Sequence, residues 1–199
     1  MSKLLFLIKY LKYLFVGKTK HGVHSPYVFD LVTKVINAKT NLQEYRLNEQ
    51  LELKGKKNKK YLKLLLRLCR YFKPKNILEI SSSSLVKSEL LAKINPESKL
   101  FYVHNNKTKQ DPELKVMDLI FIKPDINSNN TLNDFKLGLK HIHNDSFLII
   151  ENIHKTKKME NAWSKIITHN KVSVSIDLFQ IGIIFFRKEQ VKENFIIRF

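Results

Sequence analysis

The sequence of 199 residues has little cysteine, glycine or proline, and each shortage excludes a class of protein. A single cysteine, Cys69, leaves no partner for a disulfide scaffold and no set of thiolates for a zinc site. Five glycines and five prolines are too few for a collagen-like or low-complexity chain. Because 43% of the residues are hydrophobic, the chain is not disordered, and its length suits one domain with its own core.

Acidic residues are also scarce, since 18 Asp and Glu stand against 36 Lys and Arg, and the formal net charge is +18. Such a charge favours contact with nucleic acid or an anionic membrane. Only 5 of the cations are Arg, the residue that makes bidentate contacts with phosphates and bases. The 31 Lys, 17 Asn and 20 Ile together indicate a bias toward A/T-rich codons. The charge therefore admits two interpretations, a functional basic surface or a solvated lysine surface produced by that bias.

Long hydrophobic runs are missing as well. The most apolar segment, residues 3–16, contains three lysines and is shorter than the roughly 20 residues that a transmembrane helix needs. It lacks a signal-peptide cleavage site, and with the lone cysteine this favours a cytoplasmic protein. Its helical spacing predicts an amphipathic helix that either packs on its own domain or lies on a membrane surface, with these apolar residues: Leu4, Leu5, Ile8, Leu11 and Phe15.

Strands and helices alternate along the rest of the chain. Ser25 and Pro26 have the chemistry of an N-cap and a first helical position. Helices are predicted within residues 21–36, 60–72, 81–94, 131–142 and 157–168. Strands are predicted at residues 76–80, 99–103, 117–122, 146–151, 172–179 and 181–187, with residues 194–199 adding to an edge. This order predicts a mainly parallel α/β sheet with helices on both faces, closed by an antiparallel hairpin around Gln180.

Six segments carry a resemblance to a known family, in this order along the chain: HGVHSPYVFDLV from His21, YLKLLLRLCRYFKPKNILEI from Tyr61, MDLIFI from Met117, FLIIENIH from Phe147, MENAW from Met159 and IDLFQIGIIFFR from Ile176. Together they resemble a bacterial branch of the class I S-adenosylmethionine-dependent methyltransferases. The resemblance implies a Rossmann-like fold, adenosylmethionine as cofactor, and methyl transfer to a protein or small-molecule acceptor. It divides the chain into an N-terminal helical extension with a basic loop, residues 1–60, and a methyltransferase-like domain, residues 61–199.

The cofactor motifs of this chain depart from the family pattern. Where the family's first strand runs into an acid and a glycine-rich turn, this chain has Glu79 and then serines, with Ser81 and Leu85 in place of the two glycines. A Cβ costs about 1 kcal/mol or more wherever φ is positive. The ribose-binding acid at the end of the second strand is replaced by His104. By the resemblance, the cofactor-binding candidates are Glu79, Ser81, Ser83 and His104.

The catalytic candidates also come from the resemblance. The family's acidic pair after the fourth predicted strand corresponds to Glu151 and Asn152, and His24 lies in the HGVHSP turn. Because Lys123 replaces a further acid close to Asp125, we expect no metal ion at these strand ends. The remaining side chains are expected in structural or surface positions. We expect His141, His143 and His154 at the surface or a cleft edge, Asp177 in a structural position and Trp163 as a core anchor.

Part of the family's chain is missing. Only residues 105–116 separate the second predicted strand from the third, and a crossover alone needs about 10 to 12 residues. We therefore expect the family's third strand to be deleted and residues 99–103 to lie at the sheet edge. These losses predict a methyltransferase-like protein with impaired cofactor binding, acting as a non-catalytic binding or structural relative. Two alternatives stay open. One is an active methyltransferase with an unknown acceptor. The other is a basic protein that binds RNA through its net charge or a membrane surface through residues 3–16.

Overall fold

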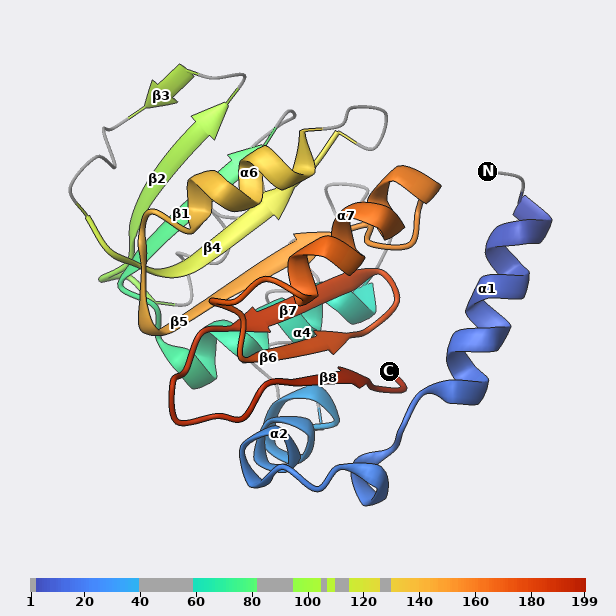
Figure 1. Ribbon diagram of the computed structural model, residues 1–199. Coiled ribbons are helices and arrows are strands. Elements are labelled where there is room, and N and C mark those ends of the chain that lie inside the picture. The colour runs from blue at the N-terminus through green and yellow to red at the C-terminus, as the bar shows by residue number, and fades with distance from the viewer. Residues whose placement is uncertain (1–2, 40–58, 82–94, 105–106, 110–114, 126–129) are drawn as a thin grey trace.

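The computed structural model describes residues 3–39, 59–81, 95–104, 107–109, 115–125 and 130–199. These residues form one eight-stranded sheet in the order β3-β2-β1-β4-β5-β7-β6-β8 (Figure 1). The predicted strands are confirmed with small shifts of their bounds. The strands are β1 (Asn76–Ser81), β2 (Lys99–His104), β3 (Lys107–Lys109), β4 (Met117–Lys123), β5 (Ile142–Glu151), β6 (Val174–Asp177), β7 (Ile181–Phe185) and β8 (Glu193–Ile196).

The sheet is mainly parallel in its first half and closed by a hairpin in its second, as the sequence predicts. β2, β1, β4 and β5 run parallel to one another, and β7 lies antiparallel between β5 and β6. β8 pairs parallel with β6 at the edge. β5 begins four residues earlier than predicted because the preceding helix already ends at Gly138, where the backbone N–H of His141 closes a turn onto the Gly138 carbonyl.

The expectation that residues 99–103 form the sheet edge is wrong. A short strand, β3, lies outside β2 and runs antiparallel to it, with His104 opposite Lys107. The sequence argument counted residues for a parallel strand, which needs a long crossover. An antiparallel strand needs only a tight connection, and two residues separate His104 from Lys107. The edge position is therefore filled without the family's longer segment.

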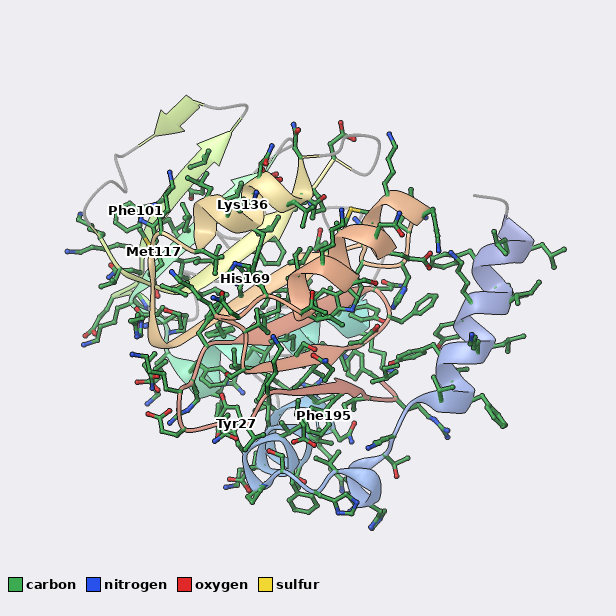
Figure 2. All side chains as sticks on the ribbon, in the orientation of Figure 1. Tyr27, Phe101, Met117, Lys136, His169 and Phe195 are labelled. Carbon is green, nitrogen blue, oxygen red and sulfur yellow. The ribbon has the colours of Figure 1, made fainter. Side chains whose placement is uncertain are left out.

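Helices cover both faces of the sheet (Figure 1). One core joins β-strand residues to α2, η2 and α4, and a second core on the other face joins them to α6 and α7. Figure 2 shows Tyr27 and Phe195 on the first side and Phe101 and Met117 on the second. The helices are α1 (Lys3–Val16), η1 (Lys20–Gly22), α2 (Pro26–Leu31), the π-helix η2 (Val32–Ile36), α4 (Lys59–Phe72), α6 (Thr131–Gly138) and α7 (Lys157–Ile167).

Two local predictions about side chains are confirmed. Ser25 caps α2 by accepting a hydrogen bond from the Val28 N–H at 3.5 Å, with Pro26 at the first helical position. Trp163 is a core anchor, 5% exposed, and its ring lies directly on Gly182 of β7. A Cβ on Gly182 would come within 2.4 Å of that ring, so the close approach of helix and strand requires glycine.

Some predictions fall outside the described residues. The helix expected after Ser81 and the candidate Ser83 belong to residues 82–94, and most of the basic loop belongs to residues 40–58. Of the helices that the structure describes, none is both long and apolar enough to cross a membrane.

Candidate functional site at the carboxyl ends of the strands

Three predicted site positions form a row across the sheet. Ser81 ends β1, and its direct cross-strand neighbours are His104 at the end of β2 and Lys123 at the end of β4. The row arises because three parallel strands of similar length start and stop together. The register of β4 with β5, which pairs Ile122 with Ile150, brings Glu151 to the same end of the sheet. The structure therefore gathers most of the predicted positions at one edge.

Glu79 lies two residues behind this row, inside β1. Residues two apart in a strand point to the same face, so Glu79 and Ser81 share a face of the sheet. Glu79 is fully buried and Ser81 is 4% exposed, while Glu151 is 8% exposed. The acidic side chains near the row are thus set into the sheet itself, whereas Lys123 is partly exposed at its edge.

Asn152 continues from Glu151 into a left-handed backbone conformation, with a φ of 62°. Asn is one of the few residues that adopts this conformation readily, because its short polar side chain tolerates it. The Asn152 N–H donates to the Gln180 carbonyl at 2.6 Å, which ties the end of β5 to the β6–β7 turn. Asn152 therefore redirects the chain at a strand end, in addition to its predicted place at the site.

The structure also assembles a charged cluster that the sequence did not indicate. Nε2 of His154 lies 2.6 Å from Oδ2 of Asp177 at the end of β6. Nδ1 of the same ring lies 3.5 Å from Oε1 of Glu160 in α7. The same Glu160 oxygen accepts a hydrogen bond of 2.7 Å from Nζ of Lys9 in α1. A chain of alternating charge therefore links the carboxyl edge of the sheet to the N-terminal helix.

The surroundings of His154 favour its protonated form. Burial opposes the charge, but the hydrogen bond to Asp177 and the negative charges of Asp177 and Glu160 outweigh it and raise the pKa of His154. A protonated ring that faces two carboxylates has no free lone pair. When it is protonated, His154 is a cationic bridge between Asp177 and Glu160.

Phe179 is the aromatic centre of this region. Its φ is 68°, and the Gln180 N–H donates to the Leu178 carbonyl across it, which makes a γ-turn with positive φ. A bulky side chain in this conformation costs on the order of 1 to 2 kcal/mol, so the surroundings must hold it. Phe179 is 2% exposed, its N–H donates to Oδ1 of Asp177, and the His154 ring stacks on it at 5.2 Å.

Helix α1 docks on this aromatic centre, past the ends of the strands (Figure 1). The rings of Phe6, Tyr10 and Tyr13 lie 5.1, 5.0 and 5.2 Å from the Phe179 ring. The Tyr13 hydroxyl donates to the Ile197 carbonyl and accepts from the Phe199 N–H at 3.0 Å. Burial raises the pKa of Tyr13 far above its ordinary value, which keeps this hydroxyl a donor.

Gly17 allows the chain to leave α1 close to the sheet. A Cβ there would lie 2.8 Å from the Tyr13 carbonyl oxygen and 3.3 Å from the Arg198 nitrogen. Lys18 then pairs with Ile197 as a parallel bridge that prolongs the β8 edge. The helix is therefore fastened at both its aromatic face and its carboxyl end.

His24 is not brought to the row. It is exposed, between η1 and α2, and Tyr27 three residues later packs edge-to-face on Phe185 at 5.3 Å. Phe185 pairs with Val174, the first residue of β6, so this contact lies at the other end of β6 from Asp177. His24 therefore lies apart from Glu151 and Asn152, the other two catalytic candidates.

The row suits adenosylmethionine poorly. This cofactor has a sulfonium cation, and its ribose hydroxyls donate best to a carboxylate. The three adjacent strand ends supply a histidine, a serine and a lysine, with no carboxylate among them. The lysine at the end of β4 disfavours a cationic ligand.

Sequence reasoning missed the cluster around His154 because its members are far apart in the chain. His154 follows β5 and contacts Asp177 at the end of β6, and Lys9 joins the cluster through Glu160 only because α1 docks there. One sequence feature could have indicated an acidic region here. Asp177 and Glu151 end two strands that the predicted hairpin places near each other. His141 is likewise 7% exposed rather than at the surface, with Nδ1 3.2 Å from the Lys115 carbonyl.

No protein-family model and no curated protein sequence matches the chain. Among solved structures, a candidate caffeoyl-CoA O-methyltransferase from Staphylococcus aureus aligns with a TM-score of 0.56 and 17% identity, over 80% of this chain and 97% of the other. The O-methyltransferase TomG from Streptomyces achromogenes, in complex with SAM, aligns with a TM-score of 0.51 and 14% identity, over 80% and 96%.

A third structure, the SAH-bound methyltransferase PaMTH1 from Podospora anserina, aligns with a TM-score of 0.51 and 11% identity, over 83% of this chain and 98% of the other. At these identities the likeness concerns the arrangement of the backbone. It agrees with the predicted mainly parallel sheet and closing hairpin. The chain has the Rossmann-like fold of class I methyltransferases.

Proposed function

We propose that this chain is a methyltransferase-like protein with impaired adenosylmethionine binding, which acts as a non-catalytic binding protein. The observation that carries the proposal is the position of Lys123, directly beside Ser81 at the strand ends. A cation there disfavours a sulfonium group, and the serine beside it carries no charge. On the other side of Ser81 the end of β2 carries a histidine, and a neutral imidazole can accept one hydrogen bond where a carboxylate can accept several.

Two acids near this edge are engaged in internal contacts. Asp177 bonds to His154 and to the Phe179 N–H, and Glu160 bonds to Lys9. These acids hold α1 against the sheet. The proposal thus assigns the carboxyl edge to docking of the N-terminal helix rather than to holding a charged cofactor.

Titration calorimetry with adenosylmethionine and adenosylhomocysteine tests the proposal. The two ligands differ in charge at sulfur, so their comparison isolates the effect of the sulfonium. We expect no saturable heat from the native protein up to millimolar adenosylmethionine. In Lys123→Gln, removal of the cation should raise the affinity for adenosylmethionine at least about fivefold more than that for adenosylhomocysteine, which corresponds to about 1 kcal/mol.

The matched control is Lys115→Gln, since Lys115 is exposed and precedes the opposite end of β4. It should leave both affinities unchanged. Micromolar binding of adenosylmethionine by the native protein would overturn the proposal. That result, together with methyl transfer to an added acceptor, would instead support the active methyltransferase.

A further inference from the structure

The outward face of α1 is an apolar surface. The side chains on it range from 45% exposed at Leu5 to 89% exposed at Phe15. We call this set the outer face of α1: Leu4, Leu5, Leu7, Ile8, Leu11, Phe15 and Val16. These seven are among twelve large hydrophobic residues that are exposed in the described part of the chain, so more than half gather on one helix of 14 residues.

The outer face lies opposite the docked face of the same helix. At 100° per residue, Phe6, Tyr10 and Tyr13 fall on one side, and Leu4, Leu11 and Phe15 fall on the other. The first set contacts Phe179 and holds the helix in place. A helix that is apolar on both sides is normally covered on both sides. A contiguous exposed patch of this kind marks a contact with a partner or a membrane.

The charge around the outer face indicates whether this contact is made with a protein partner or with a membrane. Residues 1–29 contain five lysines and no Asp or Glu. Lys12, Lys18 and Lys20 are exposed, and Lys12 lies between Ile8 and Leu5 on the helical wheel. Lys9 is the exception, because it faces the domain and is bonded to Glu160. The outer face is therefore apolar, bordered by lysines and without a nearby acid in the same segment.

We propose that the outer face of α1 lies in the headgroup region of a bilayer that contains anionic lipids. An apolar helix face edged by lysines has the composition of interfacial helices. At 14 residues α1 is about 21 Å long, too short to span a bilayer and suited to lie along its surface. Docking on Phe179 presents this face ready-made, so binding needs no folding of the helix.

A second copy of the chain fits the same face less well. A symmetric pair formed through α1 would bring two sets of lysines together, with no acid in either N-terminal segment to compensate. Like charges brought close together destabilise a contact. Anionic lipids supply the opposite charge and an apolar layer at once. This proposal does not rest on the loss of cofactor binding and stands independently of it.

Tryptophan fluorescence tests the proposal in the full-length protein. Phe15→Trp places a reporter at the most exposed position of the outer face, and the native Trp163 is buried and serves as a constant background. With vesicles of 70% phosphatidylcholine and 30% phosphatidylglycerol, the emission of this reporter should shift to the blue and be quenched by brominated acyl chains. Pure phosphatidylcholine vesicles should bind at least tenfold more weakly. Val191→Trp, 82% exposed and away from α1, should not shift.

Two further variants separate the apolar and the ionic contributions. The double variant Leu7→Gln with Leu11→Gln should reduce partitioning at least tenfold, because both side chains are about half exposed and contact lipid without contributing to the core. Lys12→Gln should reduce it roughly fivefold, the effect of one lysine near an anionic surface. Val116→Gln, at an exposed apolar position elsewhere, is the matched control and should change nothing.

Three results would overturn the proposal. The first is an absence of partitioning to anionic vesicles at low salt by a protein with native circular dichroism. The second is an emission of the Phe15→Trp reporter in buffer that is already as blue as that of Trp163, which would mean that the chain covers its own helix. The third is a dimer by light scattering that Leu11→Gln dissociates, which would assign the face to a second copy.

Discussion

The carboxyl ends of the strands differ between the two halves of the sheet. In the half made by β2, β1 and β4, the adjacent ends are His104, Ser81 and Lys123. In the half made by β5 and β6, the strands end in Glu151 and Asp177, and Asp177 leads through His154 and Glu160 to α1. One half ends in basic and neutral residues, and in the other half Asp177 is engaged in internal contacts.

This difference separates what the fold determines from what the residues at its edge determine. The positions at the strand ends follow from strand length and register, which the hydrophobic core fixes. The side chains at those positions contribute little to that core and can change separately. The fold therefore says where a site would be, and only the residues there say what it can hold.

The largest expected effect tests the aromatic centre of the second half. Phe179→Ala removes the ring that contacts α1 and His154, and it should lower the free energy of unfolding by about 3 to 5 kcal/mol. Urea unfolding measures this change, and limited proteolysis should release α1 first. Phe29→Ala, at a position 42% exposed, is the control and should change stability by less than about 0.5 kcal/mol.

Replacement of the same residue by glycine sharpens the comparison. Phe179→Gly removes the ring too but relieves the positive φ, so it should be about 1 kcal/mol less destabilising than Phe179→Ala. Urea unfolding of the two variants side by side gives this difference directly. A glycine variant that is less stable than the alanine variant would contradict the idea that the γ-turn is strained.

The next effect concerns the hydroxyl that fastens α1 to the carboxyl end of the chain. Tyr13→Phe leaves the Ile197 carbonyl and the Phe199 N–H without their partner, and it should cost about 1 to 2 kcal/mol. Tyr71→Phe removes a hydroxyl from a residue 45% exposed and should be nearly neutral. Equal losses in the two variants, measured by thermal unfolding, would argue against a buried role for the Tyr13 hydroxyl.

The charged bridge makes the stability of the second half depend on pH. Because the folded pKa of His154 is raised above its ordinary 6.5, its stabilisation is complete below that pH and is lost as pH rises through the folded value. His154→Gln should remove this decline from urea unfolding measured at successive pH values. An unchanged decline in the variant would assign the pH dependence to other groups.

The pKa of His169 is shifted in the opposite direction to that of His154. It lies with Lys136 on the side of α6 and α7 (Figure 2). Desolvation and the charges of Lys171, Lys192 and Lys136 lower its pKa. Because the unfolded chain then binds the proton more readily than the folded one, His169 lowers the free energy of unfolding as pH falls below 6.5. His169→Gln should therefore raise that free energy only below this pH. The same unfolding series checks both histidines.

The smallest expected effect is that of the ion pair between α1 and α7. Lys9→Met should cost less than about 1 kcal/mol, because the lysine is about a quarter exposed and its aliphatic part can still pack. The cost should fall further at high salt, as measured by urea unfolding with and without added sodium chloride. A cost of several kcal/mol would mean that the pair is buried as one unit with His154.

The sequence was sufficient for the order of strands and helices, since buried parallel strands are short apolar runs and Ser25 and Pro26 mark a helix start. It misjudged the sheet edge because a three-residue strand such as β3 has no hydrophobic pattern of its own. For residues 3–16 it indicated the helix, and an apolar face of Leu4, Leu5, Ile8, Leu11 and Phe15. That face lies outward, because the aromatic residues Phe6, Tyr10 and Tyr13 pack better on Phe179.

The row at the strand ends was predictable from register, because each of its residues follows an apolar run. The bridge from Lys9 through Glu160 and His154 to Asp177 could not be predicted. It depends on where the N-terminal helix docks, and no local sequence pattern encodes that position. The positive φ of Phe179 could not be predicted either, because no residue next to it in the sequence indicates such a conformation at an aromatic residue.

Hydrogen exchange with and without millimolar adenosylmethionine tests the central claim most directly. The account predicts that the amides of α1 are protected like those of β6 and β7, because docking on Phe179 makes them one cooperative unit. It also predicts that the ligand changes protection nowhere in β1, β2 or β4. Rapid exchange throughout α1, or new protection at the ends of β1 and β4 on adding the ligand, would contradict it.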